Sequence, residues 1–81
     1  MLVELSYDSP LFAEMNTQQI GEIIKARRDM LGIDQRTLSE ISGVAVHTVS
    51  NIEAGNGNPT VKSLDKVLGA LGLEFRVAVQ S

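Results

Sequence analysis

The sequence predicts a mainly α-helical domain of four or five short helices, followed by one C-terminal β-strand. Apolar residues recur at helical spacing from residue 16 to residue 72, and glycines interrupt this pattern at short intervals. After Gly72 the period changes to two, as in a strand with one apolar face. We therefore divide the chain into an N-terminal arm (1–15), a helical domain (16–72) and a terminal strand (73–81).

Length and composition restrict the class of protein. A chain of 81 residues forms one small domain that buries only about 60 to 65% of the surface exposed by the unfolded chain, so we expect oligomerisation to add stability. The absence of cysteine excludes disulfides and thiolate metal sites, and we expect neither a metal nor another cofactor. No stretch is long and apolar enough for a signal peptide or a transmembrane helix, which predicts a cytoplasmic protein without a membrane partner.

The charge of the chain is unevenly distributed. The formal net charge of −3 at pH 7 argues against indiscriminate binding to nucleic acid. However, Glu4, Asp8 and Glu14 account for the whole excess, and from Gln18 onward seven acidic residues balance seven basic ones. The body of the domain is therefore neutral and can hold a locally basic face.

The N-terminal arm begins with MLVELSY, in which Val3, Leu5 and Tyr7 alternate weakly with other residues. A strand and a packed extended arm both fit this pattern. The arm therefore has two possible structures at this point.

The first two helices are each bounded by a cap and a glycine. The first is predicted to begin at Asn16 or Thr17, either of which can serve as N-cap, and to end at Gly32. The second begins after the cap Asp34 and ends before Gly43, after barely two turns. The residues expected to face the core are Ile20, Ile23, Ile24, Ala26, Met30 and Leu31 in the first helix, and Leu38 and Ile41 in the second.

The third and fourth helices follow the same logic. The third runs from Ala45 or Val46 to Glu53, where the run GNGNP ends it, and the fourth begins at Thr60 and is closed by Gly72. The residues expected to face the core are Val49 and Ile52 in the third helix, and Val61, Leu64, Val67, Leu68 and Leu71 in the fourth.

The terminal strand needs a partner, because an unpaired edge with an apolar face is a template for association. Either the N-terminal arm or the same strand of a second copy can supply it. We expect the second arrangement to build a dimer. The residues of the predicted dimer strand are Leu73, Phe75, Val77 and Val79.

The second and third helices are joined by a turn that contains Gly43, which is typical of a helix-turn-helix that places its second helix in the major groove of DNA. Asn can pair with the N6 and N7 edge of adenine, and a small apolar side chain can meet the thymine methyl group. The same spacing also occurs in helical bundles that bind no DNA, so the pattern leaves both functions open. The residues predicted to contact bases are Val46, His47, Ser50 and Asn51.

Residues 35–72, QRTLSEISGVAVHTVSNIEAGNGNPTVKSLDKVLGALG, resemble the Xre/Cro type of helix-turn-helix repressor, and residues 20–79 are similar to the HipB-type antitoxins within that group. The resemblance implies a lambda-repressor-like fold, with residues 16–72 as the DNA-binding domain. The features that carry it are Gln35 at the start of the second helix, Gly43 in the turn, the TVSNIE run, the Gly55 stop, Pro59 before the last helix and the strand after LGL.

The resemblance also implies roles for individual residues. Gln35 matches a residue that binds a DNA phosphate at a helix N-terminus, where the helix dipole favours an anion. Arg28 and Glu53 match a structural ion pair that is buried between the first and third helices, and removing one partner would cost about 3–5 kcal/mol. Val46, His47 and Asn51 match positions that face base edges. The predicted phosphate contacts are Gln35, Arg36, Thr48, Asn56 and Asn58.

Three departures from the family pattern weaken the expected affinity of a single copy for DNA. Ala45 replaces the usual Ser or Thr cap, a loss worth about 1 kcal/mol, and Ser39 replaces a usual Ala, which we expect to be tolerated. Asn56 and Gly57 stand where many relatives carry Lys or Arg, and each missing phosphate neutralisation lowers the log–log salt slope by about one unit. Two linked copies on a palindrome would restore affinity. The basic residues expected to supply part of the missing field are Lys25, Arg27 and Arg36.

No constellation in the sequence supports an enzyme. His47 is the only histidine, and no carboxylate pair near it in the sequence offers a metal site or a catalytic base. Ser9 and Ser50 have no base to activate them, and GNGNP does not follow a strand in a βαβ unit. We therefore assign no catalytic residue and no metal ligand.

These features predict a homodimeric repressor that reads a palindromic operator in double-stranded DNA. The resemblance implies an antitoxin of a HipBA-like toxin–antitoxin operon, which it would autoregulate, with a HipA-like kinase toxin as partner. The alternative is a protein-interaction module that neutralises a toxin and has little DNA binding of its own, consistent with the acidic arm and the uncharged loop. Salt-dependent binding to upstream DNA separates the two.

Overall fold

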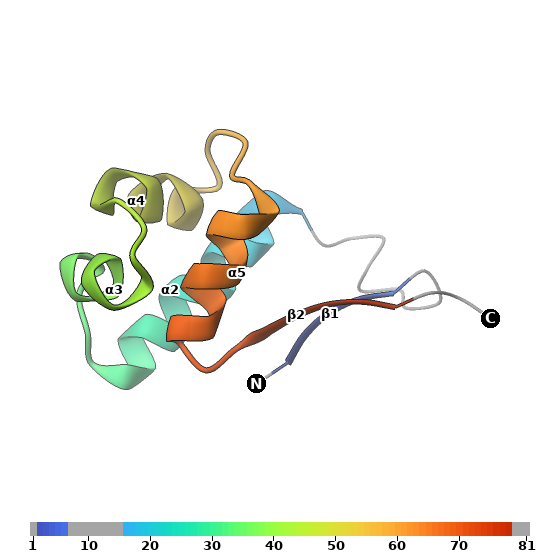
Figure 1. Ribbon diagram of the computed structural model, residues 1–81, viewed down its shortest axis with the longest axis horizontal. Coiled ribbons are helices and arrows are strands. Elements are labelled where there is room, and N and C mark those ends of the chain that lie inside the picture. Colours follow the sequence, from blue (N-terminus) through green and yellow to red (C-terminus); the bar gives the residue numbers. More distant parts are fainter. Residues whose placement is uncertain (1, 7–15, 79–81) are drawn as a thin grey trace.

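The computed structural model describes residues 2–6 and 16–78, which form four helices and two strands (Figure 1). The predictions for residues 7–15 and for Val79 lie outside these residues. The helices are α2 (Thr17–Leu31), α3 (Gln35–Ser42), α4 (Val46–Ala54) and α5 (Val61–Ala70), and the strands are β1 (Leu2–Ser6) and β2 (Glu74–Ala78).

The caps predicted for the first two helices are present. The Asn16 side chain accepts a hydrogen bond from the backbone N–H of Gln19 (2.9 Å), and the Gln19 side chain accepts one from the backbone N–H of Asn16 (2.8 Å). This reciprocal pair is a capping box, and it satisfies two donors that the first helical turn would otherwise leave unpaired. At α3, the Asp34 carboxylate accepts the backbone N–H of Thr37 (2.7 Å), which lowers the pKa of that carboxyl group.

The turn between α3 and α4 is closed by two serine hydroxyl groups. Ser39 Oγ donates to the carbonyl oxygen of Val44 (2.6 Å), and Ser42 Oγ accepts the backbone N–H of Val44 (3.3 Å). Gly43 occupies the left-handed region at φ +74°, where a side chain would be strained. The Ser39 hydroxyl is therefore more than tolerated, because it fixes the path by which the chain enters α4. As predicted, Ala45 provides no side-chain cap for that helix.

One apolar core joins the four helices. Two residues that were expected to face it lie outside: Ile41 is 58% exposed and Val61 is 65% exposed. Leu38 is the only buried residue of the two-turn helix α3, and Val61 is the first residue of α5, ahead of its buried positions. The prediction is also wrong for three residues of α2, Ala26, Met30 and Leu31, which are exposed because the buried face of this helix is narrower than its apolar pattern. The core residues are Ile20, Ile24, Leu38, Val44, Val49, Ile52, Leu64, Val67, Leu68, Leu71 and Leu73.

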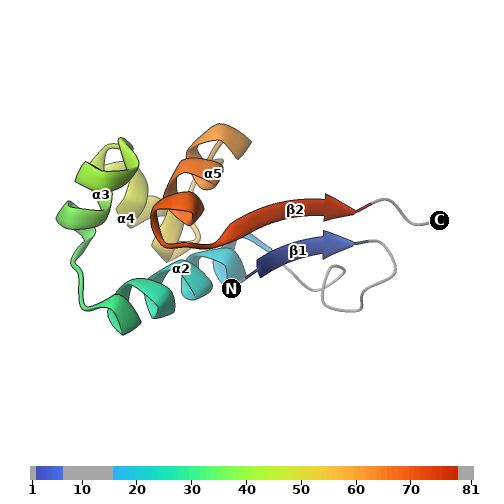
Figure 2. The ribbon, with the colours of Figure 1, turned by 60° about the horizontal axis from the view of Figure 1, so that its bottom comes forward.

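The two strands form a parallel sheet in which Leu2 lies opposite Glu74 and Ser6 lies opposite Ala78. Both strands run away from the helices (Figure 2). Of the two structures that the arm allowed, residues 2–6 adopt the strand, and within this chain β1 is the partner of β2.

Leu73 precedes β2 and belongs to the core of its own chain. It is 5% exposed, and its backbone N–H donates to the carbonyl oxygen of Leu68 (2.8 Å). Leu73 is thus already covered and is not free for a dimer interface, which corrects its assignment there. The side chains of Phe75 and Val77 are outside the described part of the structure.

Candidate nucleic-acid interface

Helix α4 presents an exposed and largely uncharged face. Val49 and Ile52 anchor it in the core, and three of the four predicted base contacts lie exposed on its outer side: Val46, His47 and Asn51. The α-helix repeats every 3.6 residues, so these positions share one side of the first two turns. A helix with this exposure can enter the major groove without burying an unpaired charge.

A hollow of about 190 Å³ lies between α4 and the loop that follows it. His47, Thr48 and Asn51 line it from the helix, and Asn56 and Asn58 line it from the loop. The fold thus brings two of the predicted base contacts together with three of the predicted phosphate contacts. Among the lining residues that the structure describes, His47 is the one with an ionisable side chain.

A second hollow, of about 210 Å³, is lined by residues of three helices. Lys25 of α2, Gln35 of α3 and Ser50 of α4 meet there, next to Glu53 and Ala54. Ser50 is half-buried in this hollow. It lines a different hollow from His47 and Asn51, although it lies on the same side of α4 as Val46.

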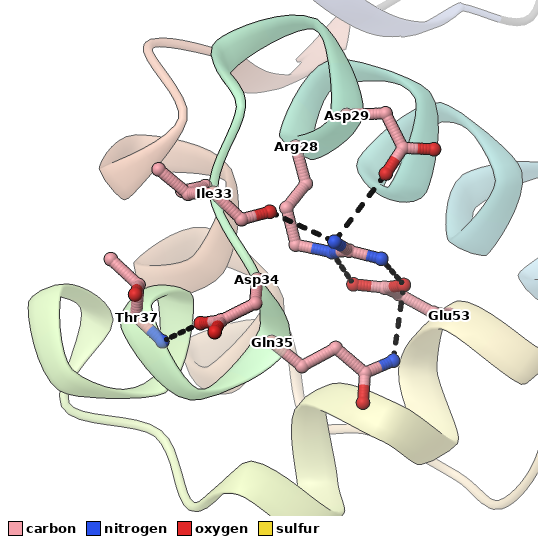
Figure 3. A network of polar contacts seen from close by, with 7 residues as sticks. All are labelled: Arg28, Asp29, Ile33, Asp34, Gln35, Thr37 and Glu53. Atoms are coloured by element: carbon pink, nitrogen blue, oxygen red, sulfur yellow. Dashed lines mark hydrogen bonds and ion pairs between the residues drawn. The ribbon is translucent and has the colours of Figure 1, made fainter.

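The predicted ion pair between Arg28 and Glu53 is present and nearly buried (Figure 3). Arg28 Nε donates to Glu53 Oε2 (2.8 Å) and Arg28 Nη2 donates to Glu53 Oε1 (3.0 Å). The side chains are 12% and 4% exposed, respectively. The hydrogen bond to Glu53 raises the pKa of the guanidinium group. Arg28 Nη1 also donates to the carbonyl oxygen of Ile33 (2.9 Å), so the ion pair joins α2, α4 and the connection to α3.

Gln35 extends this network to the surface. Its Nε2 donates to Glu53 Oε1 (3.2 Å), as Figure 3 shows. An amide nitrogen carries two hydrogens, so one remains for a further acceptor. The network therefore holds the side chain of Gln35, the predicted phosphate contact, in place at the first turn of α3.

Arg27 and Arg36, both expected to contribute to the positive electrostatic field toward DNA, differ in position. Arg36 is exposed on α3, next to Gln35. Arg27 Nε instead donates to the carbonyl oxygen of Leu71 (3.0 Å), at the C-terminal end of α5. Arg27 thus contacts the C-terminal end of α5, and its contribution to the DNA-facing field stays a prediction.

Sequence reasoning missed Gly21, which lets α2 pack directly against the backbone of α4. A Cβ atom added at this position would lie 2.3 Å from the carbonyl oxygen of Ile52 and 2.7 Å from that of Glu53. The sequence did contain a signal for this role: Gly21 interrupts the apolar pattern of a helix, and a glycine in such a position often allows close packing. Gly21 thereby sets the distance between α2 and α4, the two helices that the ion pair of Arg28 and Glu53 joins.

The described residues 2–6 and 16–78 contain no group of three or more His, Cys, Asp or Glu side chains that could hold a metal ion. Among the helices described, none is both long and apolar enough to cross a membrane.

Comparison with known proteins places the chain among DNA-associated helix-turn-helix domains. A family model described as helix-turn-helix matches residues 24–77. An uncharacterized HTH-type transcriptional regulator of Haemophilus influenzae is 42% identical over 53 residues, which are 65% of this chain and 53% of that protein. The chain therefore spans about half the length of that relative.

Two solved structures have a similar fold. The restriction-modification controller protein C.AhdI from Aeromonas hydrophila matches with a TM-score of 0.67 and 28% identity, over 72% of this chain and 88% of its own. A tyrosine-to-phenylalanine mutant of the restriction-modification controller protein C.Esp1396I matches with a TM-score of 0.66 and 27% identity, over 74% of this chain and 80% of its own.

Proposed function

The chain belongs to the helix-turn-helix family, and from this premise we propose that it is a sequence-specific transcriptional repressor that binds a palindromic operator as a homodimer. The observation that carries the proposal is the exposed face of α4, flanked on each side by a polar hollow. A helix of about 10–12 Å diameter fits a major groove about 12 Å wide, so a DNA backbone runs along both of its sides.

Base reading is assigned to Val46, His47 and Asn51. Asn51 can form the bidentate pair with adenine, and Val46 can cover a thymine methyl group. Asn56 and Asn58 are assigned to phosphates of one backbone. Amide side chains hold phosphates in register without neutralising them, so we expect modest affinity for a single copy and strong dependence on two linked copies.

Asn51→Ala tests base reading. We expect a loss of about 1–3 kcal/mol in binding free energy for the selected operator and a much smaller loss for random duplex DNA, because a base contact carries discrimination. Asn58→Ala is the matched control, since it removes the same side chain from the loop and should weaken both DNAs similarly. Fluorescence anisotropy on both duplexes measures the effect. Equal losses for Asn51→Ala on the two duplexes would contradict the assignment.

The homodimer is assigned to β2. Among the described residues, β1 pairs with one edge of β2, and we assign the other edge to a second copy. Antiparallel pairing of two β2 strands would give a closed twofold dimer, as a palindrome requires.

Truncation after Leu73 tests this dimer. The core retains Leu73, so we expect the helices to remain folded by circular dichroism while analytical ultracentrifugation shows a monomer. Operator affinity should fall far more than helicity because avidity is lost. A truncated chain that stays dimeric at micromolar concentration would place the interface on the helices.

Two operon contexts are consistent with such a repressor. The sequence resemblance supports an antitoxin of a HipBA-like operon, with a HipA-like kinase toxin as partner. The fold similarity to two restriction-modification controller proteins supports a controller role instead. A toxin-neutralising interaction module with little DNA binding is the third alternative, and absence of operator binding at low salt, with the toxin present, would favour it. Co-purification with the product of the neighbouring gene distinguishes the partners.

A further inference from the structure

We propose that Arg27 fixes the angle at which β2 leaves the helical domain, and thereby sets the spacing of the two operator half-sites that a dimer can read. The inference rests on the proposed function, in which β2 joins the two copies. Arg27 is then a positioning residue that acts through the geometry of the dimer. This role needs no contact between Arg27 and DNA.

The junction between α5 and β2 is short and packed. Helix α5 ends at Ala70 and β2 begins at Glu74, so residues 71–73 connect them. Leu71 is 1% exposed and Leu73 is 5% exposed, and both belong to the core. Figure 2 shows β2 leaving the helices from this junction. The strand is therefore attached to the helical domain by a buried segment and not by a free linker.

Backbone hydrogen bonds hold the junction to the end of α5. The N–H of Gly72 donates to the carbonyl oxygen of Gly69 (3.1 Å), and the N–H of Leu73 donates to that of Leu68 (2.8 Å). Gly72 lies in the left-handed region at φ +73°, which glycine adopts without steric cost. These contacts link β2 to α5 alone.

Arg27 links the junction to a second helix. From α2, its Nε donates to the carbonyl oxygen of Leu71 (3.0 Å), 44 residues further along the chain. The last carbonyl groups of a helix have no partner within the helix, and a cation at this end interacts favourably with the helix dipole. Within the described part of the chain, this is the one side-chain hydrogen bond that reaches residues 71–73.

The length of β2 makes a small rotation at the junction important. The strand has 5 residues, so at about 3.4 Å per residue it is about 17 Å long. A rotation of about 10° at the junction moves the far end of such a strand by about 3 Å, which is close to the rise of about 3.4 Å per base pair of DNA. A junction held by α2 and α5 therefore keeps the two α4 helices of a dimer at one separation. A junction held by α5 alone permits neighbouring separations.

Arg27→Met tests this role on operators of different spacing. The half-site selected by the wild-type protein is placed in palindromes whose spacer is shortened or lengthened by one base pair. We expect the wild-type protein to bind these about tenfold more weakly than the best palindrome, because avidity requires both copies to engage. For Arg27→Met we expect this difference to fall to about threefold or less. Fluorescence anisotropy measures each affinity relative to a single half-site, so that an effect of the lost charge cancels.

Two variants control for charge. Arg27→Lys keeps the charge and a donor for the carbonyl group of Leu71, so it should keep most of the preference for one spacing. Lys66→Met removes a positive charge from an exposed position of α5 outside the junction, and it should weaken binding by the same factor at every spacing. Circular dichroism and analytical ultracentrifugation should show a folded dimer for each variant, because the core and β2 are unchanged.

The possible outcomes separate the role of Arg27 from the proposed function. An unchanged spacing preference for Arg27→Met, or an equal loss at every spacing, overturns the role of Arg27 alone. An unfolded or monomeric Arg27→Met also overturns it, since Arg27 would then be required for the fold or for dimerisation. If the wild-type protein binds the best palindrome no more tightly than a single half-site, the proposed dimeric repressor itself is wrong, and the role of Arg27 falls with it.

Discussion

Arg28→Ala is expected to lower the free energy of unfolding by about 3–5 kcal/mol, because it leaves the Glu53 carboxylate buried without its partner. Glu53 is 4% exposed, and Arg28 donates to both of its oxygens. The total stability of a small domain is only about 5–15 kcal/mol, so this one change removes a large part of it. Thermal and urea denaturation followed by circular dichroism measure the loss.

Two further variants test whether the loss of stability comes from the buried pair of Arg28 and Glu53. Asp29 is 60% exposed and lies 3.4 Å from Arg28, so Asp29→Ala should change stability by less than about 1 kcal/mol. Replacing both partners, as Arg28→Met with Glu53→Leu, should recover much of the loss, since a buried pair is often replaceable by apolar residues. If Arg28→Ala melts normally but binds DNA poorly, Arg28 is a phosphate contact and its structural assignment is wrong.

Gly21→Ala is expected to be nearly as damaging. The added Cβ would lie 2.3 Å from one backbone carbonyl oxygen and 2.7 Å from another. These are backbone atoms and cannot rotate away, so α2 and α4 must separate. Overpacking usually costs about 1–3 kcal/mol, and we expect about 3 kcal/mol here. The separation would also lengthen the bonds between Arg28 and Glu53.

Gly69→Ala is the matched control for this substitution. Gly69 also lies inside a helix, but an added Cβ there meets nothing within 4 Å. Alanine is the better helix former, so the variant should be more stable by about 0.5–1 kcal/mol. Opposite signs for the two substitutions in denaturation experiments support a packing role for Gly21, and equal small effects would refute it.

Sequence reasoning was accurate where the cause is local. The helix ends depend on caps such as Asn16 and Asp34 and on the left-handed glycines Gly32 and Gly43, all of which act within one turn. The burial of Val49 and Ile52 followed from helical periodicity in the same way. Such features were predicted because each requires only neighbouring residues.

Predictions that required knowledge of the neighbouring elements were less successful. Ile41 follows Leu38 at helical spacing, yet it is exposed, because periodicity does not tell which part of a helix another element covers. The bond from Arg27 to Leu71 joins residues that are distant in the sequence. The hollow of Lys25, Gln35 and Ser50 likewise exists only after three helices have packed, so the sequence pattern could not show which residues line it.

The pairing of β1 with β2 also determines the order in which the protein is assembled during synthesis. Leu2 lies opposite Glu74. Strand β1 therefore cannot pair with β2 until helices α2 to α5 have been translated. A chain grows from its N-terminus, and contacts distant in sequence close late because loop closure opposes them. We expect the helical domain to fold before the sheet, and a dimer built on β2 to form only after synthesis. Under the proposed function, operator binding by that dimer would therefore lag behind translation of the chain.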